Sequence, residues 1–292
     1  MPNPNVYKEV SMAFFSGSRI NTNIAARNSL DALNRINAKT GQVQLRLATG
    51  KRVNSVADDA AGYTLAKKTE NRYRSLQSAV KNIGEAKNIL SVAESGFQAI
   101  NDILLQVKEK VVQAGNASYT TEERNALSSE VTQLGSEIDR IVAETKFNGI
   151  QLLSNNGLSD ADFQVGADNT DSITFSLTAS VSASSLSVTS STIPTGSDAT
   201  QIGTSLSSID SAIDTVSAEL QEIGSLVNRL DFKEQVVSSA ITNLKASASR
   251  IMDADVAQEQ LESTKLSILQ QTATTQLTQA NSAPQNILSL FR

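Results

Sequence analysis

The chain has 292 residues and a formal net charge of −5, and only 4% of its residues are aromatic. It contains no Trp, no Cys and no His. Without Cys and His there can be no disulfide, no Cys/His zinc site, no thiol nucleophile and no imidazole base. Catalysis would have to rest on carboxylates, Lys, Ser or Tyr, so we expect no enzymatic activity, no cofactor and no metal site. The scarcity of aromatic residues also argues against a conventional globular core.

The charged residues are unevenly distributed. Residues 1–60 carry 8 Lys and Arg against 4 Asp and Glu, whereas no Lys or Arg lies between Lys146 and Arg229. An anionic middle segment repels nucleic acid, and no aromatic side chain lies between Arg19 and Arg52 on which bases could stack. We therefore expect no nucleic-acid binding. No run of about 18 apolar residues occurs, so we also expect no membrane insertion.

The first long apolar pattern runs from Leu76 to Ala114, with spacings of three and four residues throughout. This spacing is typical of a coiled-coil seam. At a rise of about 1.5 Å per residue it predicts a helix roughly 58 Å long. Gly115 and Asn116 should stop this helix.

A second helix is predicted to follow directly. Thr120 and Glu123 have the spacing of a capping box, and one apolar stripe runs from Leu127 to Ile141. We expect residues 148–149, Asn-Gly, to end this helix. The two helices can then fold back on each other as an antiparallel hairpin.

The stretch from residue 155 to residue 203 is rich in Ser, Thr, Asp and Asn. Apolar and polar residues alternate at 163–165 and 173–177, on either side of a turn-rich segment, which predicts a β-hairpin. After Ala179, the apolar residues Val181, Leu186 and Val188 fit either a further strand or a mobile loop. The strand is the slightly favoured alternative.

The clearest heptad pattern runs from residue 202 to residue 251, with Glu234 as its one polar interruption. A polar residue in such a seam is either a device that sets the register or a position that faces solvent. Together the three seams predict a mainly α fold, a long coiled-coil helical bundle with a small β-hairpin region.

Both ends of the chain, residues 20–47 and 256–290, permit helix but are polar between their apolar residues. Such segments cannot form a core alone, so we expect them to be loose in the monomer and to become ordered helices on polymerisation. The expected polymerisation contacts are Ile20, Ile24, Leu30, Leu33, Ile36, Leu266, Leu269, Leu277, Ile287, Leu288, Leu290 and Phe291.

Residues 45–62, LRLATGKRVNSVADDAAG, closely resemble the LSSG-R-INSA-DDAAG stretch of bacterial flagellins. The resemblance continues through residues 137–141, 147–149 and 163–166. It closes with residues 279–292, QANSAPQNILSLFR, which are similar to the terminal signature of that family. Order and spacing agree over nearly the whole chain.

The resemblance implies a structural subunit that polymerises into the extracellular bacterial flagellar filament for swimming motility. The subunit would be exported unfolded through a type III apparatus and assembled at the filament tip by its coiled-coil terminal helices. The implied partners are further copies of the chain, an export chaperone at the C-terminal region, and the filament cap and hook-junction proteins. A hook–filament junction protein of the same family is the alternative.

The resemblance also implies a domain division. Residues 18–60 and 253–292 would form an inner-tube domain with a spoke, and residues 61–180 and 202–252 a rod domain. Residues 1–17 would be a disordered N-terminal extension. Residues 181–201 would be a short Ser/Thr-rich surface segment in place of variable outer domains.

Two further sets of residues are candidate sites. Asp58 and Asp59 are adjacent, and adjacent side chains point about 100° apart on a helix, so an interface or capping role in the spoke is favoured over metal binding. Residues 105–113 resemble the flagellin segment that Toll-like receptor 5 recognises. Strongly recognised members carry Arg at the position of Gln106 and Leu at that of Lys110, whereas Glu130 matches their Glu. The resemblance therefore implies weak receptor activation.

Overall fold

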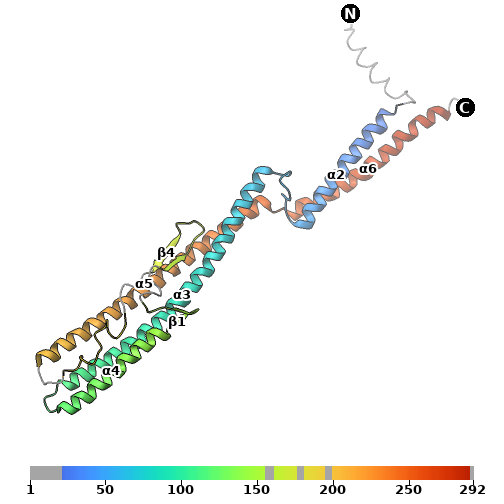
Figure 1. Cartoon of the computed structure of the whole chain (residues 1–292). Coiled ribbons are helices and arrows are strands. Elements are labelled where there is room, and N and C mark those ends of the chain that lie inside the picture. Colours follow the sequence, from blue (N-terminus) through green and yellow to red (C-terminus); the bar gives the residue numbers. More distant parts are fainter. Residues whose placement is uncertain (1–21, 155–160, 176–180, 195–198, 290–292) are drawn as a thin grey trace, which may run out of the picture. The chain divides into compact units, whose positions relative to one another are not determined.

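The computed structural model describes residues 22–154, 161–175, 181–194 and 199–289 (Figure 1). The expected N-terminal extension lies outside these ranges, as do three of the expected contact residues, Ile20, Leu290 and Phe291. The side chains of Ile287 and Leu288 are not described either. The helices are α2 (Ile24–Thr49), α3 (Ala60–Ala114), α4 (Thr121–Glu144), α5 (Ala199–Met252) and α6 (Val256–Ser289), and the strands are β1 (Lys146–Phe147), β2 (Ile150–Gln151), β3 (Ala161–Gln164) and β4 (Ser172–Phe175).

The mainly helical fold predicted from the sequence is confirmed. The chain divides into two compact units. Unit 1 comprises residues 1–69 and 246–292, and unit 2 comprises residues 70–245. The division lies a little later in α3 and a little earlier in α5 than the expected boundaries at residues 60 and 253. No described helix is long and apolar enough to cross a membrane.

Unit 2 is built around the α3 seam. Every seam residue from Leu76 to Ala114 is buried, as the 3,4 spacing predicts. Side chains from α4, α5, both hairpins and the segment 181–194 complete a single hydrophobic cluster around it. The α5 residues that belong to this core at seven-residue intervals are Ile202, Ile209, Val216, Ile223 and Leu230. The coiled-coil pattern therefore predicts the core of unit 2 correctly.

Helix α4 begins where the sequence predicts but ends earlier. The Thr120 hydroxyl accepts a hydrogen bond from the Glu123 backbone N–H, and the Glu123 carboxylate accepts one from the Thr120 N–H at 2.7 Å, which completes the capping box. The helix ends at Glu144. Asn148 and Gly149 do not end it but form the two-residue turn between β1 and β2, with φ angles of 48° and 84°. Asn-Gly favours positive φ at both positions, and this makes it a strong hairpin signal.

The second hairpin lies where the sequence predicts it. β3 and β4 pair antiparallel, with Phe163 opposite Ile173. Asn82 of α3 donates its side-chain N–H to the carbonyl of Gln164. In the turn, Asp168 pairs with Arg72 of α3 at 3.2 Å and Asp171 with Lys233 of α5 at 3.8 Å. The hairpin is thus held to both long helices of unit 2.

Residues 181–194 do not form the favoured strand. Their hydrogen bonds are those of local turns, such as the bond from Val188 N to Ala183 O. Ala183 N also donates to the Asp139 carboxylate of α4 at 2.8 Å. The apolar side chains of Val181, Leu186 and Val188 are buried, so the segment is not simply a surface feature. The alternating pattern arises from successive turns that point apolar residues into the core.

Unit 1 is a pair of helices with a thin core. α2 and α6 pack side by side (Figure 1), and the buried side chains that the structure describes in this pair are Val43, Leu266 and Ala273. Polar contacts join the pair elsewhere, including Gln270 to Asn37 at 3.0 Å. The described parts of both ends are thus helical in the single chain.

Replacing Phe97 by Ala should lower the free energy of unfolding of unit 2 by about 3–5 kcal/mol, because it leaves a cavity where an aromatic ring was fully buried. Urea unfolding followed by circular dichroism measures this change. The control is Val92→Ala in the same helix, where the side chain is 38% exposed, and it should cost less than about 1 kcal/mol. Equal losses in both variants would contradict the central place of Phe97 in the core.

Candidate functional site

The expected polymerisation contacts fall into two groups in the structure. Leu33, Ile36, Leu266 and Leu277 are buried or half-buried in the seam between α2 and α6. Part of their apolar surface is thus covered within the chain, and whether these residues also contact a neighbouring subunit stays a prediction. Leu33 and Ile36 are three residues apart on α2, and Leu266, the buried Ala273 and Leu277 are seven and four residues apart on α6, which is the heptad spacing of a two-helix coiled coil.

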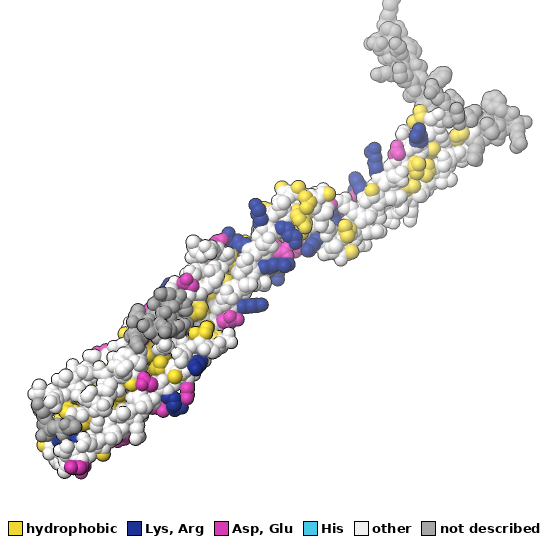
Figure 2. All heavy atoms as spheres, in the orientation of Figure 1, with side chains coloured by type: hydrophobic (Ala, Val, Ile, Leu, Met, Phe, Trp, Pro, Cys, Tyr) yellow, Lys and Arg dark blue, Asp and Glu magenta, His cyan; other side chains and the backbone are white. Residues whose placement is uncertain are grey.

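Ile24, Leu30 and Leu269 form the second group. Each is exposed, because it lies away from the seam. Figure 2 shows hydrophobic side chains at the surface of the α2–α6 pair. Apolar residues that a two-helix unit leaves uncovered are typical of an interface with another molecule.

Four further exposed apolar residues of α2 and α6 are not among the expected polymerisation contacts. They are Leu45 on α2 and Val256, Leu261 and Ile268 on α6. Leu261 has the largest exposed fraction among them, at 72%. Leu261 and Ile268 are seven residues apart, so they lie on one side of α6, and this second stripe could have been detected as a heptad out of phase with the first.

Beside Leu261 lies a shallow groove between α2 and α6. Its walls combine apolar and charged side chains, and Arg46 of α2 pairs with Glu259 of α6 within it at 3.3 Å. The lining residues are Val43, Arg46, Gln258, Glu259, Leu261, Glu262 and Lys265. We give the name α2–α6 face to the whole outer surface of this helix pair, with the groove and the exposed apolar residues Ile24, Leu30, Leu45, Val256, Leu261, Ile268 and Leu269.

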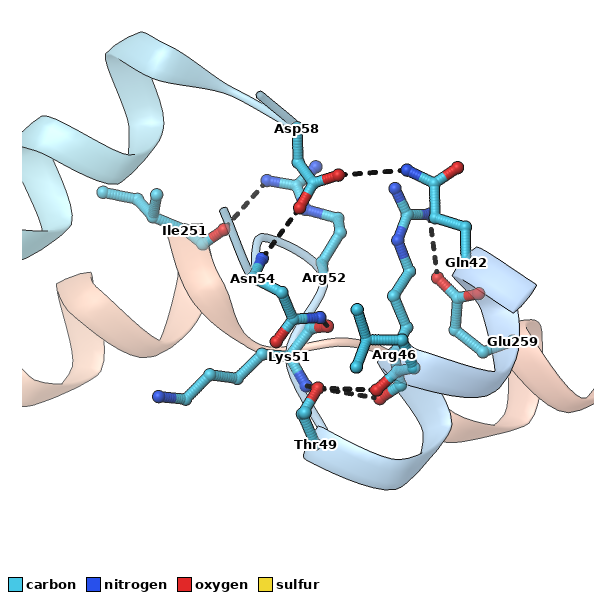
Figure 3. Close-up of polar contacts among 10 residues, drawn as sticks. Gln42, Arg46, Thr49, Lys51, Arg52, Asn54, Asp58, Ile251 and Glu259 are labelled. Carbon is cyan, nitrogen blue, oxygen red and sulfur yellow. Dashed lines mark hydrogen bonds and ion pairs between the residues drawn. The ribbon is translucent and has the colours of Figure 1, made fainter. Parts of the chain in front are cut away.

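The connection from α2 to α3, residues 50–59, is organised by Asp58 (Figure 3). Its carboxylate accepts hydrogen bonds from the backbone N–H groups of Asn54 at 3.1 Å and Ser55 at 2.9 Å. It also accepts one from the Gln42 side chain of α2 at 3.0 Å. These hydrogen bonds lower the pKa of Asp58 below its ordinary value of 3.8. The bond from Ser55 N–H has the largest effect and the bond from Asn54 N–H the second largest. The charged form of Asp58 therefore ties α2 to the connection.

Asp59 has a different partner. Its carboxylate accepts a hydrogen bond from Gly62 N–H at 2.9 Å, in the first turn of α3, where unpaired N–H groups need acceptors. The two aspartates thus serve separate backbone groups and do not converge on one position. Among the described residues no group of carboxylates has an arrangement that could hold a metal ion.

The same connection also pairs with the short link between α5 and α6. Gly50 ends α2 with a φ of 66°, a value that favours glycine. Its carbonyl accepts from Ala254 N–H at 2.9 Å, and Arg52 N–H donates to the Met252 carbonyl at 2.7 Å. The guanidinium of Arg52 reaches the Ile251 carbonyl at 3.1 Å (Figure 3). These bonds satisfy backbone groups where both chain segments leave their helices.

The three residues of the receptor-like segment lie in unit 2. Gln106 is exposed on α3. Lys110 Nζ lies 2.7 Å from the Glu130 carboxylate of α4, and this hydrogen bond raises the pKa of Lys110. Glu130 is thus already paired within the chain.

Comparison with known families gives two matches that together span most of the chain. Residues 20–157 match the bacterial flagellin N-terminal helical region, and residues 206–291 match the bacterial flagellin C-terminal helical region. The chain is 34% identical over 304 residues to a flagellin of Bacillus subtilis, covering 94% of this chain and 100% of that protein. It is 32% identical over 285 residues to the flagellar filament 33 kDa core protein of Treponema phagedenis, covering 94% and 99%.

Solved structures give a weaker comparison. The crystal structure of Bacillus cereus flagellin is 28% identical, covers 57% of this chain and 94% of its own, and has a TM-score of 0.46. A structure assigned to a flagellar hook-associated protein of Vibrio parahaemolyticus has a TM-score of 0.57 at 18% identity, covering 67% and 100%. At that identity the second likeness concerns the fold alone.

Replacing Asp58 by Ala should speed amide hydrogen exchange at Asn54 and Ser55, since both lose their acceptor. In the unchanged chain the carboxylate has a lowered pKa when folded, so its stabilising effect is present above the unfolded pKa and is lost as pH falls through the folded value. Protection of the two amides should therefore persist from neutral pH to about 4 and be lost only as the pH falls through the folded pKa, which lies below 3.8.

Amide hydrogen exchange, detected by NMR or mass spectrometry, measures both the faster exchange in the variant and the dependence of protection on pH in the unchanged chain. The matched control is Asp31→Ala, an exposed aspartate of α2 for which the described residues provide no hydrogen bond or ion pair. Equal acceleration in both variants, or protection of Asn54 and Ser55 that survives well below the folded pKa of Asp58, would contradict this role.

Proposed function

Because this chain belongs to the bacterial flagellin family and is a structural subunit that polymerises into the flagellar filament, we propose that its α2–α6 face is where neighbouring subunits join. As a flagellin it serves motility as a filament component outside the cell and is not an enzyme. The proposal identifies the surface through which one subunit contacts its neighbours in the filament.

The observation that carries the proposal is the exposure of apolar side chains on a unit with a thin core. Covering one such side chain contributes roughly 1.5–3 kcal/mol. Leu261, at 72% exposed, gains nearly all of that only when another molecule covers it. Several such side chains on one two-helix unit supply a driving force for association.

The same reasoning supports the expectation that the ends are loose before polymerisation. A helix pair that buries few side chains of its own gains most of its stability from further packing. The described part of unit 1 buries few, whereas unit 2 has a continuous core. In this proposal unit 2 stabilises the free subunit, and unit 1 becomes fully ordered on assembly.

The same surface also supports the partners other than further copies of the chain, namely the export chaperone, the filament cap and the hook-junction proteins. A free subunit that exposes the α2–α6 face would associate prematurely, so an export chaperone that covers the C-terminal region has a physical purpose. Export of the unfolded chain is compatible with the absence of Cys, because no disulfide can trap it. The filament cap and hook-junction proteins would contact the same terminal helices.

We also propose that this flagellin activates Toll-like receptor 5 weakly. The specific observation is the ion pair between Lys110 and Glu130, at 2.7 Å. A receptor cation would have to displace Lys110 to reach Glu130. Gln106 in addition lacks the charge of the Arg that strongly recognised members carry at its position.

Replacing Leu261 by Ser should raise the critical concentration for polymerisation roughly tenfold to a hundredfold, the equivalent of one lost apolar contact. Ile268→Ser should act in the same direction. Sedimentation of filaments at increasing protein concentration measures the change.

The matched control is Ser267→Ala, which alters an exposed polar side chain of the same helix. Circular dichroism of the free subunit should be unchanged in all three variants, because each altered side chain is exposed. Polymerisation of both apolar variants at the unchanged concentration would refute the assignment of the α2–α6 face.

The receptor proposal is tested with purified monomer in a receptor reporter assay. The unchanged chain should give a weak response, and the variant Gln106→Arg, Lys110→Leu should lower the half-maximal concentration roughly tenfold, the effect of one contact of about 1.4 kcal/mol. Lys146→Leu, an exposed lysine elsewhere in unit 2, is the control. A potent response to the unchanged chain would contradict the proposal.

A further inference from the structure

Two lysines of α3 pair with carboxylates of α5 at equal intervals. Lys87 Nζ lies 2.7 Å from Asp231 and 2.6 Å from Glu234, and Lys108 Nζ lies 2.6 Å from Asp210. Three heptads separate the two lysines on α3, and three heptads separate Asp210 and Asp231 on α5. Because the residue numbers run in opposite directions, both pairs belong to one antiparallel register of the two helices.

One half of the apolar seam, at every seventh residue of each helix, discriminates poorly between registers. At seven-residue intervals α5 carries Ile, Ile, Val, Ile, Leu and Val, from Ile202 to Val237, and all six are buried. The equivalent α3 positions from Leu76 to Val111 read Leu, Ile, Leu, Phe, Leu and Val. A shift of one heptad therefore still brings aliphatic side chains together at most layers, and among these positions Phe97 alone has a distinct shape.

We propose that Lys87 and Lys108 form a register lock, which selects one alignment of α5 against α3 as unit 2 folds. The ion pairs are partly exposed, and such pairs contribute little to absolute stability. Their effect lies in the difference between correct and shifted alignments. The lock concerns unit 2 and does not depend on the assembly proposal.

Both one-heptad shifts remove every pair of the lock. In one direction Lys87 meets Ser238 and Lys108 meets Ser217, whereas in the other they meet Gly224 and Gly203. None of these four residues carries a carboxylate.

Glu234 makes the shifted alignments of α5 against α3 unfavourable for a second reason. It interrupts the apolar seam of α5, and in the correct register Lys87 neutralises it. The first shift brings Glu234 opposite Glu94, a like charge, and the second brings it opposite Val80. A carboxylate without a cation in a half-buried seam is unfavourable. Glu234 is therefore a polar residue that specifies register, as polar residues do at seam positions of other coiled coils.

The pairs are also well formed. The hydrogen bonds to Asp231 and Glu234 raise the pKa of Lys87, and the bond to Asp231 has the larger effect. One ammonium group thus serves two carboxylates that lie almost one turn apart on α5. Lys87 and Lys108 can take part in such an arrangement in the correct register and in neither shifted one.

The test is a refolding experiment on the full chain. The sequence has no Cys, so cysteines introduced at the exposed positions Ser91 and Ser225 are the only sites for spin labels. Their separation is measured by pulsed electron resonance after refolding from urea. A one-heptad shift moves α5 by about 10.5 Å along its axis, which gives a separate distance peak.

The lock variant is Lys87→Met with Lys108→Met, which keeps side-chain length and removes charge. The otherwise unchanged labelled chain and the control Lys81→Met, an exposed lysine of α3 for which the described residues provide no ion pair, should each give one distance. The lock variant should give the native distance and a second, shifted one. A single native distance in the lock variant would overturn the proposal.

A charge-swapped variant keeps the test decisive if the lock variant folds poorly. It combines Lys87→Glu and Lys108→Glu with Asp210→Lys, Asp231→Lys and Glu234→Lys, so that every pair is retained with its signs reversed. It should refold to the single native distance. A second distance in this variant would equally overturn the proposal, since its pairing is intact.

Discussion

The structure depends on one constraint, namely that a long helix with a single apolar stripe must have that stripe covered by another element. In unit 2 the α3 stripe is covered by α4, α5, the hairpins and the segment 181–194, and the result is a continuous core. In the described part of unit 1 the main packing is between two helices, α2 and α6, and two helices cannot enclose apolar residues on their outer sides. Unit 2 thus has the core of a folded domain, while unit 1 retains apolar surface that suits a polymerising protein.

Where helices end, the structure depends on hydrogen bonds rather than on apolar burial. The turn into α3 contains backbone N–H groups that no helix satisfies, and Asp58 and Asp59 accept from them. The end of α5 lies along the same turn, so that the carbonyls of Ile251 and Met252 accept from Arg52.

Charge has separate roles in the two units. In unit 2 most cations pair with nearby carboxylates, including Lys87, Lys108 and Lys110. Such pairs are weak individually but depend strongly on alignment, so they suit the selection of a register and the masking of a surface carboxylate. In unit 1 the groove of the α2–α6 face contains Arg46 and Glu259 beside Leu261, so charge and apolar surface lie together at the proposed contact.

The sequence by itself determined the helical fold, the α3 and α5 seams, the capping box at Thr120 and the hairpin of β3 and β4, because each depends on residues close together in the chain. It also determined the flagellin family. Tertiary structure decided which terminal apolar residues face inward. Leu33 and Leu266 are half-buried and buried in the pair of α2 and α6, whereas Leu30 and Leu261 are exposed, and this depends on how two helices about 200 residues apart in sequence are rotated. It likewise decided that residues 181–194 fold as turns over α4 and that Glu234 faces Lys87, because their partners are distant in sequence.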